Sequence, residues 1–220
     1  LASLAFGTWV GPQRVHREGI DGLDVRDIEF AGDLGYVVKL LAIAERTAEG
    51  VSARVHPAMV PSDHPLAAIR GATNAIFIEG PSIDELLFAG PGAGGEPTAS
   101  AVLGDVIDAA RELLSGSQVA PRIRFAPGDV VDFGRVATKW YLRLEVLDAP
   151  GVLATVAGVF GDAGVSIKSV WQEGRGAEAT LLLVTHEASE ADQQRAVAAL
   201  AALDEVEEIA ATIRVAGEET

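Results

Sequence analysis

Hydrophobic and polar residues alternate most regularly in the last third of the chain. In chain order, the predicted elements there are strand 140–147, helix 150–164, strands 165–171 and 178–185, helix 189–201 and strand 206–215. Gly164 is expected just past the end of the first helix, and Ser189, three residues before Asp192, is expected to cap the second. The order βαββαβ predicts a split βαβ sheet with both helices on one face.

The first half of the chain mixes helical and strand periodicities. Its predicted elements are helix 25–34, strands 36–44 and 51–55, a short helical piece at 65–69, strands 74–79 and 85–89, and helix 98–114. Asp24, three residues before Asp27, is the expected N-cap of helix 25–34. Pro57 and Pro61 are expected to end strand 51–55, because proline cannot donate to a strand ladder. Weak periodicity at 118–138 is typical of a linker with room for an edge strand.

Composition narrows the classes of function. The net charge of −15 and the pI near 4.6 leave no basic face for phosphates, so we expect no nucleic-acid partner. The absence of cysteine excludes disulfides and thiolate metal sites and fits a cytoplasmic protein. No apolar run reaches the roughly 18 residues that cross a bilayer. His56 and His64 lack a zinc-type spacing, so no metal site is predicted.

The chain opens directly into the apolar segment LASLAFGTWV. Apolar residues fall at helical spacing from Leu1, with neither an N-cap residue nor an initiator methionine before them. A helix that starts without a cap is typical of a helix cut through. We therefore expect a fragment or a processed product.

The turn that follows strand 140–147 reads DAPGVL, residues 148–153, and Asp148 is expected to cap the helix that begins there. The stretch LEVLDAPGVLATVAGVFGDAGVSIKSVWQEG, residues 144–174, resembles the ACT domain, the amino-acid-sensing module of biosynthetic enzymes. In such domains this turn presents backbone N–H groups at a helix N-terminus, which suits an amino-acid carboxylate. The resemblance implies an effector site formed by Asp148, Gly151, Val152, Leu153, Ser166 and Ile167.

Two interpretations of this turn stay open. Many ACT domains carry Asn-Ile at the start of the second strand, whereas this chain has Ser166-Ile167, which weakens the side-chain half of the site. The turn either senses an amino acid or only packs, with the module serving to pair chains.

A glycine-rich loop precedes helix 98–114. Gly90, Gly92 and Gly95 satisfy G-x-G-x-x-G after a strand and before a helix. No clear parallel strand follows the helix, and no acidic residue stands at a strand end about 20 residues on, as a dinucleotide site needs. The loop is therefore either a close-approach loop for a ligand held largely elsewhere or a plain tight turn.

Three segments of the first half resemble the catalytic domain of homoserine dehydrogenase. They are GYVVKLLAIAE (35–45), VHPAMVPSDHPLAAIRGATNAIFIEG (55–80) and FAGPGAGGEPTASAVLGDVIDAARE (88–112). The resemblance implies an α+β fold in which a mixed-sheet catalytic domain at 1–117, truncated at its N-terminus, is followed by a linker at 118–139 and a ferredoxin-like ACT domain at 140–216.

The resemblance also implies a chemistry, the reduction of aspartate 4-semialdehyde to homoserine with NAD(P)H. The family's cofactor domain is a Rossmann fold, and its catalytic lysine lies in a D-x-x-G-x-D-x-x-x-K-type motif. Neither is expected here, because the only lysines, Lys39, Lys139 and Lys168, follow no such motif. By resemblance, Gly92, Ala93 and Gly94 close over the nicotinamide side of the cofactor, and Glu96 lies in the helix that packs back on the missing domain.

The leading hypothesis is the C-terminal part of an NAD(P)-dependent homoserine dehydrogenase, inactive by itself, with L-threonine as the expected effector. This places the intact protein in threonine, methionine and isoleucine biosynthesis. The alternative is a stand-alone amino-acid-binding or dimerisation module without a catalytic role. A homodimer or higher oligomer is expected, because ACT sheets usually pair side by side.

Overall fold

The computed structural model describes residues 1–116, 125–174 and 179–217. They form two compact units. One contains Leu1–Pro61 and the described residues from Phe125 onward, and the other contains the described residues from Ser62 to 116. Among the described residues, no helix combines the length and apolar character that crossing a membrane requires.

The larger unit is built on an eight-stranded mixed sheet. Its strand order is β1-β3-β10-β6-β8-β7, with β2 paired to β3 and β9 paired to β6. The strands are β1 (His16–Arg17), β2 (Tyr36–Thr47), β3 (Gly50–Pro61), β6 (Ala137–Val146), β7 (Ile167–Glu173), β8 (Ala179–Thr185), β9 (Ala188–Ser189) and β10 (Val206–Val215). The helical elements are α1 (Ala2–Phe6), η1 (Pro12–Arg14), α2 (Val25–Asp33), η3 (Phe133–Arg135), α4 (Val152–Asp162) and α5 (Glu190–Leu200).

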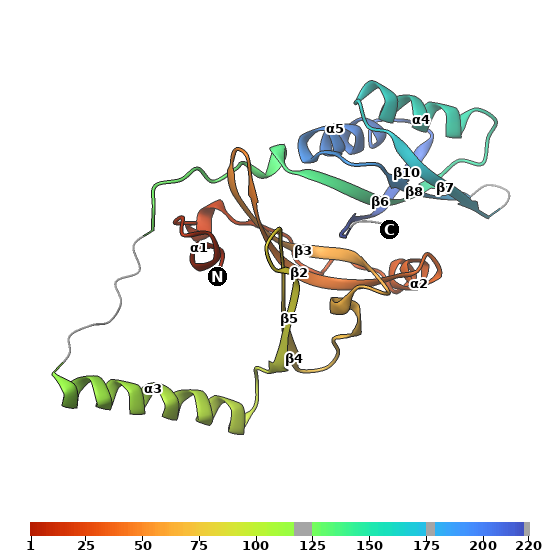
Figure 1. Ribbon diagram of the computed structural model, residues 1–220. Coiled ribbons are helices and arrows are strands. Elements are labelled where there is room, and N and C mark those ends of the chain that lie inside the picture. Colours follow the sequence, from red (N-terminus) through yellow and green to blue (C-terminus); the bar gives the residue numbers. More distant parts are fainter. Residues whose placement is uncertain (117–124, 175–178, 218–220) are drawn as a thin grey trace. The chain divides into compact units, whose positions relative to one another are not determined.

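The predicted βαββαβ module is confirmed as β6-α4-β7-β8-α5-β10, and α4 and α5 lie together on one side of the sheet (Figure 1). Their apolar faces bury a core with the sheet that includes Leu144, Phe160, Leu183 and Leu200. Each such side chain contributes about 1.5–3 kcal/mol when it leaves water. The predicted cap of α5 is confirmed, since the Ser189 hydroxyl accepts the Asp192 backbone N–H.

Helix α2 lies on the opposite side of the module's strands from α4 and α5 (Figure 1), and Met59 of β3 and Tyr36 and Val38 of β2 join the apolar cluster on that side. Ala31 of α2 is buried against Tyr141 and Ile213 of the module. Asp24 caps α2 as predicted, with its carboxylate accepting the Arg26 backbone N–H at 2.9 Å. Strand β3 runs parallel to β10 and pairs Ala58 with Arg214, so the first sixty residues and the βαββαβ module share one sheet.

The prediction that the prolines end strand 51–55 is wrong, because β3 continues to Pro61. Along its whole length β3 pairs with β2, from Gly50 opposite Thr47 to Pro61 opposite Tyr36. On its other edge, Pro57 lies between the two residues paired with β1 and the two paired with β10, and Pro61 is the last residue of the strand. At these positions a missing N–H interrupts little of the ladder.

The smaller unit contains η2 (Pro65–Ala68), β4 (Thr73–Gly80), β5 (Asp84–Pro91) and α3 (Gly95–Ser115). The hairpin β4–β5 is in register from Thr73–Pro91 to Gly80–Asp84, which confirms the two predicted strands. Helix α3 begins three residues before the predicted start at 98. Its apolar stripe is exposed in this chain, from Leu103 at 60% to Leu114 at 89%.

The predicted linker lies partly outside the described residues, which resume at 125. From there the chain runs beside the N-terminal segment, with bridges from Ala126 to Thr8 and from Val130 to Val51. Trp9 packs against Phe125, with ring centroids 5.5 Å apart. Strand β6 then begins at Ala137.

Candidate functional site

A cavity of about 380 Å³ opens where β6 turns into α4. It is lined by residues 146–153 together with Gln172 of β7 and Leu181 of β8. Four predicted site residues, Asp148, Gly151, Val152 and Leu153, therefore line one cavity. Gln172 and Leu181 also line it and were not predicted.

The turn into α4 is shaped by backbone conformation. Gly151 is the N-cap residue with a φ of 97°, a left-handed conformation that glycine adopts without steric cost. The expectation that Asp148 is the N-cap residue is wrong, because Gly151 holds that position and makes no side-chain cap bond. The Ala149 N–H instead donates to the Leu147 carbonyl at 3.0 Å, which closes the turn tightly. The Val152 N–H, the first of α4, donates to the Ala149 carbonyl at 3.3 Å. The N–H groups that follow it in the first turn are those a helix N-terminus offers to another acceptor.

The polar groups of the cavity match a free amino acid. The N-terminus of α4 offers backbone donors and the positive end of a helix dipole to a carboxylate. Asp148 brings a carboxylate that can face an ammonium group, and Gln172 brings both a donor and an acceptor. Leu147 and Leu153, 39% and 43% exposed, supply apolar surface for a short side chain.

In a single copy of the chain, Ser166 and Ile167 do not line this cavity. They stand at the start of β7, where the Ser166 carbonyl accepts the His186 N–H at 2.8 Å and Ile167 pairs with Thr185. Gln172 lies five residues further along the strand, about 16 Å away at 3.3 Å per residue. Strand β7 is the last in the sheet order.

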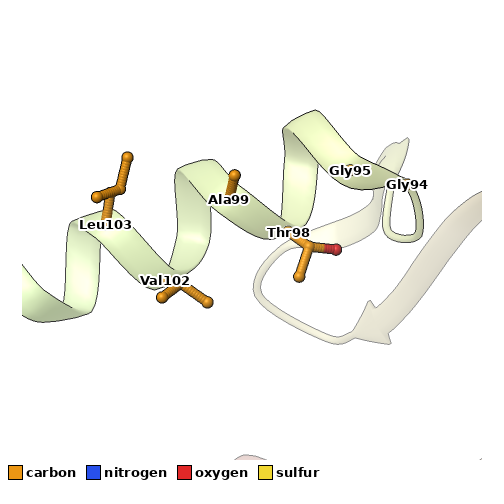
Figure 2. Close-up of a pocket in the computed structure, with 6 residues that line it drawn as sticks. All are labelled: Gly94, Gly95, Thr98, Ala99, Val102 and Leu103. Atoms are coloured by element: carbon orange, nitrogen blue, oxygen red, sulfur yellow. The ribbon is translucent and has the colours of Figure 1, made fainter.

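The glycine-rich loop leads into α3 in the smaller unit. A hollow of about 680 Å³ is lined there by Gly94, Gly95, Thr98, Ala99, Val102 and Leu103. Figure 2 shows Thr98 and Val102 projecting to one side of the helix and Ala99 and Leu103 to the other.

The backbone of this loop needs glycine at two positions. A Cβ at Gly92 would overlap the Asn74 side-chain amide, and Gly94, the N-cap of α3, has a φ of 124°. Of the predicted cofactor-contacting residues, Gly94 lines the hollow, Glu96 lies in the first turn of α3, and Gly92 and Ala93 precede it. The loop thus offers bare backbone and a helix N-terminus to one side of a ligand.

The two histidines considered for a metal serve local roles. His56 is buried on β3, where its Nδ1 lies 2.9 Å from the Pro57 carbonyl. Burial lowers the pKa of His56, and the neighbouring Arg214 and Arg54 lower it further. His64 caps η2 by accepting the Leu66 N–H at 3.1 Å. The described residues contain no cluster of three or more metal-binding side chains.

Two family models match the chain. Residues 1–107 match homoserine dehydrogenase, and residues 140–205 match the ACT domain. The homoserine dehydrogenase of Corynebacterium glutamicum is 44% identical over 219 residues, which cover 97% of this chain and 49% of that protein. The Mycobacterium tuberculosis enzyme is 44% identical over 228 residues, covering 99% of this chain and 52% of that protein. The chain spans about half the length of the curated relatives it matches.

Solved structures agree with these sequence matches. The crystal structure of a homoserine dehydrogenase from Thiobacillus denitrificans superposes with a TM-score of 0.89 at 34% identity, over 98% of this chain and 50% of that one. A Staphylococcus aureus homoserine dehydrogenase, 23% identical with a TM-score of 0.65, covers 99% of this chain and 51% of that one, and shares the fold.

Proposed function

Because the chain belongs to the homoserine dehydrogenase family and carries an ACT domain, we propose that it supplies the substrate-side scaffold and the regulatory module of an NAD(P)-dependent homoserine dehydrogenase. The intact enzyme reduces aspartate 4-semialdehyde to homoserine in the cytoplasm, on the route to threonine, methionine and isoleucine. One observation carries this proposal: a single superposition on a homoserine dehydrogenase spans 98% of the chain, including both matched segments.

NAD(P) supplies the hydride in this reaction. The bare backbone at Gly92–Gly94 and the N-terminus of α3 fit contact with one side of the cofactor. The rest of a dinucleotide site needs a parallel βαβ unit, and the smaller unit contributes an antiparallel hairpin and one α-helix among its described residues.

None of the three lysines of the chain lies in the family's D-x-x-G-x-D-x-x-x-K-type motif. Lys39, Lys139 and Lys168 stand on β2, β6 and β7. Lys139 Nζ donates to the Gly217 carbonyl at 3.4 Å. We therefore expect the 220-residue chain to be inactive without a cofactor domain that brings its own proton-transferring lysine.

The second part of the proposal concerns the cavity at the β6–α4 turn, which holds an amino-acid effector, with L-threonine as the first candidate. The effector's carboxylate binds the N-terminus of α4, its ammonium group faces Asp148, and Gln172 contacts its side chain.

A homodimer completes this site. Strand β7 ends the sheet order, and an unpaired strand edge is a template for pairing with a second copy. Antiparallel pairing of two β7 strands about a twofold axis brings the start of one strand beside the end of the other. Ser166 and Ile167 of the partner subunit then approach Gln172 and the cavity.

The catalytic part is tested by joining this chain at Leu1 to the preceding part of the C. glutamicum relative. We expect the hybrid to oxidise homoserine with NAD+ or NADP+, and the 220-residue chain alone to show no turnover. A correctly folded hybrid without activity, or turnover by the chain alone, contradicts the proposal.

A further inference from the structure

Helix α2 is fastened to the ACT sheet by a buried ion pair. The Arg143 guanidinium on β6 donates from Nε to Asp27 Oδ1 at 2.7 Å and from Nη2 to Asp27 Oδ2 at 3.1 Å. The side chains of Arg143 and Asp27 are 2% and 0% exposed. Because 116 residues separate the two, this pair joins the segment matched by the homoserine dehydrogenase model to the segment matched by the ACT model.

The same guanidinium extends the network across the sheet. Arg143 Nη1 donates to Glu145 Oε1 at 2.9 Å, and the Thr180 hydroxyl on β8 donates to Glu145 Oε2 at 2.6 Å. Glu145 and Thr180 are register partners in the β6–β8 ladder. One continuous chain of hydrogen bonds therefore leads from β8 through β6 to α2.

This hydrogen-bonded network begins one residue away from the candidate effector cavity. Val146 and Leu181 line the cavity, and they directly follow Glu145 and Thr180 in the sequence. Successive side chains of a strand point to opposite faces, so each of these two strands contacts the cavity on one face and the network on the other. A shift of either strand against a bound effector must move the carboxylate or the hydroxyl behind it.

We propose that the network Thr180–Glu145–Arg143–Asp27 transmits occupancy of the cavity to α2. This inference rests on the proposed effector function. Glu145 and Arg143 act as positioning residues: they hold the N-terminal turn of α2 in an orientation that depends on where β6 and β8 lie. The shift of β6 or β8 on effector binding reaches α2 through these polar contacts, while the apolar contacts of Ala31 keep the helix on the sheet. Helix α2 directly precedes β2 and β3 in the chain.

Hydrogen exchange of the complete 220-residue chain, with and without saturating L-threonine, tests this inference. In the wild type we expect slower exchange both in the turn 147–153 and in α2, by at least about fivefold, the lower end of typical allosteric coupling. Thr180→Val and Glu145→Leu each remove a link of the network, and neither leaves a new unpaired charge, because Arg143 keeps Asp27. Both should keep the calorimetric affinity and the protection of the turn but lose the response of α2. Thr212→Val, the same change on β10 outside the network, should respond like the wild type.

The possible outcomes distinguish failure of the transmission from failure of the effector site. If the turn responds in the wild type but α2 does not, or if α2 responds in Thr180→Val and Glu145→Leu as it does in the wild type, the transmission is refuted and the effector site stands. If neither region responds and calorimetry shows no heat, the effector site itself is refuted, and the inference falls with it.

Discussion

Substituting Asp27 by alanine strips the buried Arg143 guanidinium of its strongest partner. The Asp27 carboxylate accepts two bonds from Arg143 and one from the Tyr141 hydroxyl at 3.3 Å, and it is fully buried. Breaking a buried ion pair costs about 3–5 kcal/mol, because the remaining charge is left uncompensated. Glu145 still holds Arg143 in the variant, so we expect the lower end, about 3 kcal/mol.

Urea denaturation followed by tryptophan fluorescence measures this cost. Trp9, Trp140 and Trp171 all lie in the larger unit, so the signal reports the unit that contains the ion pair. With an m-value of about 2 kcal/mol/M, a loss of about 3 kcal/mol moves the midpoint down by about 1.5 M.

Two further variants establish the cause. The double variant Asp27→Leu/Arg143→Met removes both charges and should recover most of the loss, because an apolar pair of similar volume is often neutral. Glu49→Ala breaks the Arg135–Glu49 pair, whose side chains are 65% and 49% exposed, and should change stability by less than about 1 kcal/mol. An Asp27→Ala cost no larger than that of Glu49→Ala would refute the reasoning.

Three other changes follow from the geometry. Gly151→Val forces a β-branched residue to a φ of 97°, and we expect at least tenfold weaker L-threonine binding by calorimetry. The control Gly158→Ala, in the middle of α4, should bind L-threonine normally and gain about 0.5–1 kcal/mol in unfolding free energy. Gly92→Ala should displace the Asn74 amide, seen as new chemical shifts along β4, and Gly92→Ala/Asn74→Ala should restore them; an unshifted spectrum for the single variant contradicts the close contact. The pKa of His56 is lowered in the folded state, so as the pH falls the imidazole of the unfolded chain is protonated first. The His56 contribution to the free energy of unfolding should therefore be constant above about pH 6.5. Below that pH it should fall by at most about 1.4 kcal/mol per pH unit. Urea midpoints between pH 7.5 and 5.5 measure this, and His56→Gln should flatten that slope if His56 is its source.

Local signals were sufficient to predict the βαββαβ module. The alternating pattern of β6, the cap at Ser189 and the glycine after α4 each act over a few residues. The predicted strand 206–215 agrees with the structure at both ends. The same kind of signal failed at Pro57, because the tolerance of a proline depends on which neighbouring strands lie opposite it.

Contacts between distant segments could not be predicted from such signals. Nothing in the local pattern of Asp27 or Arg143 identifies the other as a partner, and the parallel pairing of β3 with β10 joins residues more than 150 positions apart. Gln172 had a usable signal in the topology. The start of β8 lies between the end of β6 and the end of β7, so residues just before the β7–β8 turn lie at the same end of the sheet as the β6–α4 turn.

Calorimetric titration of the purified chain with L-threonine tests most directly whether the β6–α4 turn binds an amino acid. We expect a saturable heat with L-threonine and a much weaker one with D-threonine, whose ammonium group and side chain cannot both reach Asp148 and Gln172 once the carboxylate is bound. Equal heats for the two enantiomers, or a flat L-threonine titration of the folded chain, would contradict it.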